Sequence, residues 1–150
     1  MPVDRSHDQA NERERLRLVA LAGRSEAELG RELAGGWTVA AALAHVAFWE
    51  RFAVERWKVW LRDRALPPLP PYTTDTLNDG LLHQWLAIPP KAAAREAVAA
   101  AEAIDRLIRE LADEAIEAYR ASLAPGQPHT LLDRSPHRRE HCDHIEKVLG

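Results

Sequence analysis

The segment from Thr38 to Arg64 constrains the fold most strongly, because apolar residues recur along it at helical spacing. They fall on one face at Val39, Leu43, Val46, Ala53 and Trp57. Thr38 is a suitable N-cap residue, and the prolines at 67, 68, 70 and 71 require an extended connection after the helix. A long helix with a single apolar face has to bury that face, so the segment favours a bundle of packed helices.

Other segments of the chain are also expected to be helical, with glycines and prolines separating them. They comprise residues 6–22, 74–86, 91–122 and 137–149, together with a short helical turn from a capping box at 25–28 to Leu33. The run 91–122 is predicted as one long helix because it contains almost no helix breakers. No segment alternates as a strand would. The sequence therefore predicts an all-α, single-domain four-helix bundle over residues 1–150, with a short additional helix.

Local signals refine the two ends of this bundle. In the first helix, Leu16, Val19 and Ala20 mark the expected apolar stripe. Ser135 is the expected N-cap of the last helix, because Pro136 then occupies the first helical position. The charged runs 12–15 and 138–140 are expected to be solvated helix faces.

Composition excludes several classes of function. The formal net charge is −3 and no basic stripe is present, so nothing indicates a nucleic-acid partner. The apolar stretches are too short to span a bilayer, and the N-terminal segment lacks the apolar core of a signal peptide. The single cysteine, Cys142, permits no internal disulfide. We therefore expect a soluble cytoplasmic protein with no membrane partner.

Two histidines four residues apart, His137 and His141, lie on one face of the last predicted helix. A third histidine, His45, borders the apolar face of the long helix 38–64. Three neutral imidazoles can hold a divalent metal, zinc best and nickel or iron(II) as alternatives, with a position left for water or substrate. The alternative is that each histidine is simply packed, with its ring nitrogens hydrogen-bonded to backbone or water.

The remaining histidines and the cysteine receive simpler interpretations. His144 follows His141 by three residues and is interpreted as a residue at the rim of the site or a partner of its ligands, rather than a fourth ligand. His7, His83 and His129 have no partner at a useful spacing and are expected on the surface. Cys142 points about 100° around the helix from His141, so it is expected to be a small core residue.

Aromatic and acidic residues near His45 offer few catalytic candidates. Trp49 and Phe52 are candidates for lining a pocket, although aromatics at this spacing also suit a core. Glu50 falls on a different helical face from His45, so it is not proposed as a general base. The other tryptophans are interpreted as packing residues: Trp37, Trp57, Trp60 and Trp85.

Three ordered motifs resemble the DinB/YfiT-like superfamily. Gly36-Trp37-Thr38-Val39 and the following run Leu43 to Glu50 are similar to its second-helix signature. The run from His137 to His141, with Ile145, is similar to its last-helix signature. The residues from Asp75 to Asn78 resemble the variant that includes DfsB-type and maleylpyruvate-isomerase-like members.

The resemblance implies a four-helix bundle in which His45, His137 and His141 hold a divalent metal. Through the same likeness, Asn78 becomes a candidate pocket residue. Relatives of this kind are transferases and isomerases that use mycothiol, bacillithiol or glutathione, and others hydrolyse or neutralise reactive small molecules. His144 departs from the pattern, because many relatives carry glutamine there.

Three functions are compatible with these observations. The first is a metal-dependent enzyme that activates a low-molecular-weight thiol to attack an electrophilic small molecule. The alanine- and arginine-rich composition is typical of a GC-rich bacterial genome, which makes mycothiol one candidate thiol. The second is a hydrolase in which the metal activates water. The third is a non-catalytic, stress-linked bundle that binds or dimerises, whose metal site is structural or vestigial; a structural site would usually have four protein ligands. A homodimer is compatible with each of them.

Overall fold

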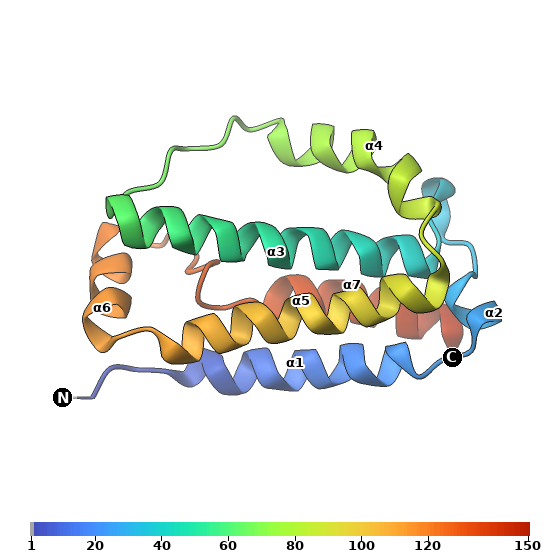
Figure 1. Cartoon of the computed structure of the whole chain (residues 1–150), viewed down its shortest axis with the longest axis horizontal. Helices are drawn as coiled ribbons and strands as arrows, with labels where there is room; N and C mark the ends of the chain where they lie inside the picture. The colour runs from blue at the N-terminus through green and yellow to red at the C-terminus, as the bar shows by residue number, and fades with distance from the viewer. Residues whose placement is uncertain (1) are drawn as a thin grey trace.

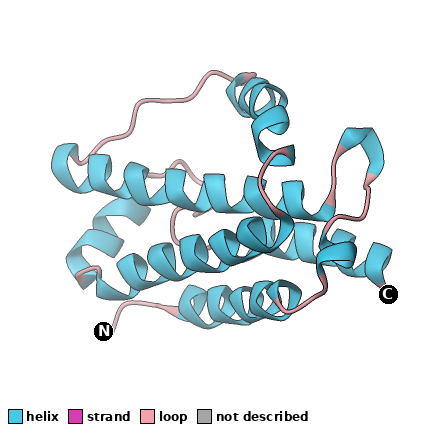
Figure 2. Cartoon of the chain, turned by 45° about the vertical axis from the view of Figure 1, so that its right-hand side comes forward, coloured by secondary structure: helices cyan, strands magenta, loops and turns pink. Residues whose placement is uncertain are grey.

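The computed structural model describes residues 2–150, which form helices joined by loops (Figures 1 and 2). The helices are α1 (Ser6–Ala22), α2 (Glu26–Leu29), η1 (Ala34–Gly36, a 3-10 turn), α3 (Val39–Asp63), α4 (Thr73–Leu86), α5 (Pro90–Glu110), α6 (Asp113–Ser122) and α7 (Ser135–Leu149). Over the described range, strand pairing is limited to an isolated bridge between Glu32 and Thr38. None of these helices is both long enough and apolar enough to cross a membrane.

Four helices form the body of the bundle. Helix α3 packs against α5, α5 against α1, α1 against α7, and α7 against α3, so the four helices enclose a common core (Figure 1). The predicted all-α bundle is confirmed. Helix α4 packs on the outer side of α3, and α6 lies across one end of the bundle (Figure 1).

The core divides along the bundle axis. One cluster joins α1, α3, α5 and α7 around Leu43 and Ile145, and a second fills the end covered by α6, around Trp57 and Ile108. A third cluster lies between α3 and α4, where Trp85 covers small side chains of α3. Alanines on α3 and α5 let these helices approach closely, because a methyl group adds little bulk between two backbones.

The prediction of one helix over 91–122 is wrong, because the chain turns at Leu111 and Ala112. Both residues have extended backbone dihedrals, with ψ of 136° and 147°. Arg5 holds this corner by donating hydrogen bonds to the carbonyl oxygen of Leu111 and to Asp113, each at 2.7 Å. The turn lets α6 bury Ile116 and Tyr119 over the end of the bundle.

Two of the three N-cap residues predicted from the sequence cap their helices in the structure. The Thr38 side chain accepts a hydrogen bond from the amide of Ala41, and Ser25 forms the expected capping box with Glu28, although α2 ends at Leu29 and not at Leu33. Ser135 is not an N-cap. It is the first residue of α7, and its hydroxyl and amide both donate to Asp133.

Helix α1 buries a different face from the one predicted. Leu16 and Val19 are exposed, at 53% and 43%, and Ala20 is exposed as well. The buried face runs through three polar residues before it reaches apolar ones: His7, Asn11, Glu14, Leu18 and Leu21. His7 was predicted on the surface and is 93% buried, at 7% exposure. Apolar periodicity misplaces this face because three of its five buried residues are polar.

Candidate metal centre

Three histidines from two helices converge on one point between α3 and α7. The Nε2 atom of His137 lies 3.0 Å from Nε2 of His45 and 3.1 Å from Nε2 of His141. One nitrogen from each ring lies within 4.8 Å of the others. The structure therefore brings together the three histidines that the sequence selects, from positions 92 residues apart along the chain.

Helix packing explains this convergence. His137 and His141 are one helical turn apart on α7, and the neighbouring Cys142 and Ile145 are buried in the core, which fixes the rotation of the helix. His45 lies on the face of α3 that turns toward α7, in a run where every residue from 39 to 47 is buried. Since α3 and α7 pack directly, the side chains at this edge meet.

The environment keeps all three imidazoles neutral. Burial lowers the pKa of His45 to about 4, and the neighbouring His141 adds to this effect. Burial also lowers the pKa of His137, to about 2, with further contributions from His141 and His45. The pKa of His141 is lowered by burial, while Glu140 acts in the opposite direction. At neutral pH each ring therefore has a nitrogen lone pair to offer.

The donor set fits a divalent metal. Metal–nitrogen bonds of 2.0–2.1 Å in a tetrahedral site separate the ligand nitrogens by roughly 3.3 Å, close to the observed Nε2 spacings. His137 Nε2 lies within hydrogen-bond distance of two other ring nitrogens, but a neutral ring nitrogen carries either one proton or one lone pair. Packing of neutral rings therefore accounts for one of these two contacts as a hydrogen bond. A cation shared by the three Nε2 lone pairs would account for both.

The three histidines form part of the wall of a pocket of about 440 Å³, a volume in the range of small-molecule sites. The other walls come from the segment around η1 and from helices α3, α4 and α7. The remaining lining residues are Leu33, Ala34, Trp37, Ala42, Thr74, Asn78, Glu140 and His144. The converging histidines therefore face a space that can hold an organic molecule.

The pocket candidates from the sequence divide into those that line this pocket and those that do not. Asn78 lines it, whereas Trp49 and Phe52 are not among its lining residues. Trp49 instead donates its indole N–H to Asn78 at 2.8 Å, and its ring packs on Phe52 at 5.2 Å. Trp37, which was predicted only to pack, lines the pocket, with its ring edge-on to His45 at 5.6 Å.

The rim of the pocket carries polar side chains from α7 and α4. His144 is exposed and lines the pocket without joining the converging group, in agreement with a position at the rim. Glu140 and Thr74 also line it, and the sequence analysis missed both. Glu140 could have been found from its spacing, because it follows His137 by three residues on the same helical face.

Cys142 does not belong to the site. The residue is fully buried in the core between α7 and its neighbours, as predicted. Burial raises the pKa of its thiol to about 12, although Arg17 acts in the opposite direction. A thiol in this environment stays protonated and is a poor nucleophile or ligand.

A group of buried charges adjoins the histidines and was not predicted. This charge cluster consists of Glu50, Asp105, Arg134 and Arg138. Arg138 is completely buried and donates to Glu50 at 2.6 Å and to Asp105 at 2.7 Å. Arg134 donates to the other oxygen of Glu50 at 2.8 Å. The cluster therefore connects α3, α5 and the start of α7 through paired opposite charges.

The charge cluster corrects the interpretation of the charged runs as solvated faces. Arg138 and Glu14 belong to those runs, and both are buried. Arg138 also donates to the backbone oxygen of Asn11 on α1, at 2.8 Å. Glu50 turns toward these arginines, which agrees with its rejection as a general base. The salt bridges of Arg138 join residues that lie 33 and 88 positions apart in the sequence, so they have no local sequence signature.

Comparison with known proteins gives the same family as the motifs. A family model described as the DinB superfamily matches residues 10–144. The chain belongs to the DinB superfamily. The comparisons with curated proteins and with solved structures find no match. The matched range includes His45, His137 and His141, and membership of this superfamily together with the three-histidine group fits a metal-dependent enzyme.

Proposed function

We propose that this DinB-superfamily protein is a metal-dependent enzyme that activates a low-molecular-weight thiol. The enzyme would transfer the thiol to an electrophilic small molecule, or would use the thiol to isomerise or detoxify that molecule. The proposal is carried by the convergence of three neutral imidazoles on one point in the wall of a 440 Å³ pocket. His45, His137 and His141 would hold the metal. Zinc suits three imidazoles best, and nickel and iron(II) are the alternatives.

A divalent metal in such a site lowers the pKa of a coordinated thiol or water, which supplies the nucleophile. The chain contributes by adding no negative ligand, so the full charge of the metal acts on the bound group. Trp37 and the alanines of the lining make one side of the pocket apolar, which keeps electrostatic interactions strong. Asn78 and Thr74, from α4, offer hydrogen bonds that would orient the substrate.

An external thiol is favoured because the chain has no suitable thiol of its own. Cys142 is buried, and its pKa is raised to about 12. The pocket volume also exceeds what water alone would need. Mycothiol, bacillithiol and glutathione are therefore the cofactors to test, and the substrate would occupy the same pocket.

A hydrolase is the second candidate, and Glu140 favours it. Glu140 is the sole carboxylate among the residues that line the pocket, and it can accept a proton from attacking water. A closed structural site is less well supported, because His144 lies outside the converging group and leaves three ligands instead of four.

Turnover assays with and without added thiol separate these candidates. The metal-loaded protein would be mixed with a chromogenic aryl halide and each of the three thiols, and in parallel with a chromogenic ester and no thiol. We expect thiol-dependent consumption of the aryl halide, lost in His45→Ala and retained in His83→Ala, which removes an exposed histidine of α4. Ester hydrolysis without thiol would instead favour the hydrolase.

Elemental analysis tests the metal site by itself. We expect about one equivalent of metal in the purified protein and a large loss in His137→Ala/His141→Ala. The matched control is His83→Ala/His129→Ala, which removes two exposed histidines. Equal metal in the two double variants, with the helical fold retained, would contradict the assignment.

A further inference from the structure

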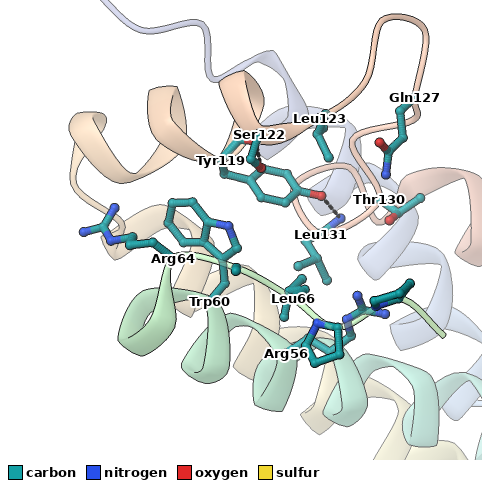
Figure 3. A pocket seen from close by; sticks show the side chains of 13 residues that line it. Arg56, Trp60, Arg64, Leu66, Tyr119, Ser122, Leu123, Gln127, Thr130 and Leu131 are labelled. Carbon is teal, nitrogen blue, oxygen red and sulfur yellow. Dashed lines mark hydrogen bonds between the residues drawn. The ribbon is translucent and has the colours of Figure 1, made fainter.

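A second cavity lies at the other end of the bundle and takes no part in the proposed function. Its volume is about 480 Å³. Arg56 at its wall follows His45 on α3 by eleven residues, a distance of about 16 Å along the helix. It is bounded by Arg56, Trp60, Arg64, Ala65, Leu66, Pro67, Pro68, Tyr119, Ser122, Leu123, Gln127, Thr130 and Leu131 (Figure 3).

The charge of this cavity is positive. Two of the thirteen lining residues are arginines, and none carries a carboxylate. Arg64 is paired with Glu114 and stacks on Trp60, with its guanidinium carbon 4.8 Å from the ring. Arg56 is half-buried and forms neither an ion pair nor a hydrogen bond in the described part of the chain, only a contact with the Phe52 ring at 5.9 Å. An uncompensated guanidinium in such a position favours an anion.

Two largely buried side chains present polar groups at the wall of the cavity. Trp60 is 2% exposed, and its indole N–H has no acceptor among residues 2–150, whereas the neighbouring Trp57 donates to the carbonyl oxygen of Leu131 at 2.8 Å. Tyr119 is 3% exposed, and its oxygen accepts a long bond of 3.4 Å from the amide of Leu131. Burial raises the pKa of Tyr119, so the phenol keeps its proton.

Figure 3 shows the nitrogen of Trp60 and the hydroxyl of Tyr119 turned toward the same space. The indole N–H of Trp60 has no acceptor among residues 2–150, and it lines the same cavity as the unpaired guanidinium of Arg56, so the cavity can offer both groups as donors to an anionic ligand. Leu66, Leu131 and the two prolines form an apolar side of the cavity, and Ser122, Gln127 and Thr130 form a polar one. The apolar side would suit a ligand with an apolar body.

We propose that this cavity binds a small organic carboxylate with an apolar ring. The carboxylate is recognised by Arg56, Trp60 and Tyr119, and the ring packs against Leu66, Leu131 and the prolines at 67 and 68. The site is independent of the histidines, so it stands whether or not the proposed thiol chemistry is correct.

NMR titration tests this site, because the five indole N–H signals report on different parts of the molecule. Trp37, Trp49 and Trp85 pack around His45, whereas Trp60 lines the second cavity and Trp57 packs against Trp60. Benzoate is the probe, benzamide its neutral analogue, and inorganic phosphate an anion with no apolar body. We expect benzoate at millimolar concentration to shift the Trp60 signal, with saturation, and the other two probes to bind at least about tenfold more weakly.

Variants assign the interaction to its residues. Arg56→Met should weaken benzoate binding about tenfold, because it removes one charge-assisted hydrogen bond. Arg62→Met is the matched control, since Arg62 is exposed on the same helix and paired with Asp63, and it should bind as the parent protein does. Trp60→Phe identifies the signal and should also weaken binding, by about threefold or more.

Several outcomes would overturn the proposal. They are the absence of a benzoate shift at Trp60, equal binding of benzamide, equal binding of phosphate, and unchanged affinity in Arg56→Met. Shifts confined to Trp37, Trp49 and Trp85 would place the benzoate at the histidines and overturn it as well.

Discussion

Two groups of buried polar side chains lie side by side between α3 and α7, and they differ in how their polar atoms are satisfied. In the charge cluster, Arg138 meets Glu50 and Asp105 at 2.6 and 2.7 Å, so opposite charges compensate each other. In the histidine group, three neutral Nε2 atoms converge, with one nitrogen from each ring within 4.8 Å of the others. The first group balances its charges within the chain, whereas the second offers three lone pairs that a cation would bind.

The two groups also depend on each other through the helices that carry them. Arg138 directly follows His137 on α7, and Glu50 follows His45 by five residues on α3. Hydrogen bonds from Arg138 to α1, α3 and α5 fix the position of α7 in the bundle. The paired charges thus hold the helix that presents His137 and His141.

The largest expected effect comes from breaking the charge cluster. Arg138→Met leaves Glu50 and Asp105 buried without their main partner, so we expect the free energy of unfolding to fall by about 3–5 kcal/mol. Chemical denaturation of the metal-free protein measures this change. Arg139→Met is the matched control, because Arg139 is the next residue and is exposed. It contributes only a long bond of 3.4 Å to Glu14, which keeps Arg17 at 2.9 Å, so this variant should cost less than about 1 kcal/mol.

Removing the three most buried charges provides the complementary test. The triple variant Glu50→Leu/Asp105→Leu/Arg138→Met leaves only Arg134 and Arg15, which reach solvent, without their carboxylates. It should therefore recover a large part of the stability lost in Arg138→Met. If the triple variant is as unstable as the single one, the loss arises from packing and not from unpaired charge.

The next largest effect should come from adding metal. At a free zinc concentration about 100 times its dissociation constant, binding stabilises the folded state by about 2.7 kcal/mol. We expect this gain in the parent protein and in His83→Ala, and its absence in His137→Ala/His141→Ala. Thermal denaturation with zinc and with a chelator measures it. A gain of the same size in the double variant would mean that zinc binds elsewhere.

The pH dependence of the metal-free protein should follow from the lowered histidine pKa values. His45 has a pKa of about 4 in the folded state against an ordinary value of 6.5, so the unfolded chain binds the proton more readily. Stability is therefore unaffected above about pH 6.5 and falls as the pH drops toward 4, by up to about 1.4 kcal/mol per pH unit for each proton. Denaturation at several pH values should show a flatter profile for His45→Gln. An identical profile in that variant would assign the acid sensitivity to other groups.

The sequence was sufficient for most of the fold, because apolar periodicity, caps and prolines are local signals. It failed where a distant contact decides the local structure. The break after α5 contains neither glycine nor proline, and Arg5 stabilises it from more than 100 residues away. The buried face of α1 was missed for a related reason: Asn11 and Glu14 are buried through bonds to loops and helices far along the chain.

The candidate site shows the same division. The histidines were recognisable because two of them share a helical face and all three border apolar segments. The charge cluster was not recognisable, since no local sequence pattern distinguishes a buried arginine from an exposed one. Of the pocket residues on α4, the sequence predicted only Asn78. Thr74 was missed because the packing of α4 on α3 places it at the pocket.

The smallest expected effect concerns the contact that holds α4 at the pocket. Asn78 accepts a hydrogen bond from the indole of Trp49 at 2.8 Å, and it also lines the pocket. Asn78→Ala should cost about 1 kcal/mol of stability, since it removes one hydrogen bond. Thr76→Ala, at an exposed position of the same helix outside the lining, should cost less.

Amide hydrogen exchange shows whether this bond acts locally. Helix α4 lies outside the four-helix body and packs mainly on α3, so losing the bond should speed exchange in α4 more than in α1, α5 or α7. Metal content should stay the same, because Asn78 is not part of the converging histidines. A loss of metal in Asn78→Ala would mean that the α4 wall and the histidines form one unit. Helix α4 would then belong to the histidine site itself and not only to the wall of its pocket.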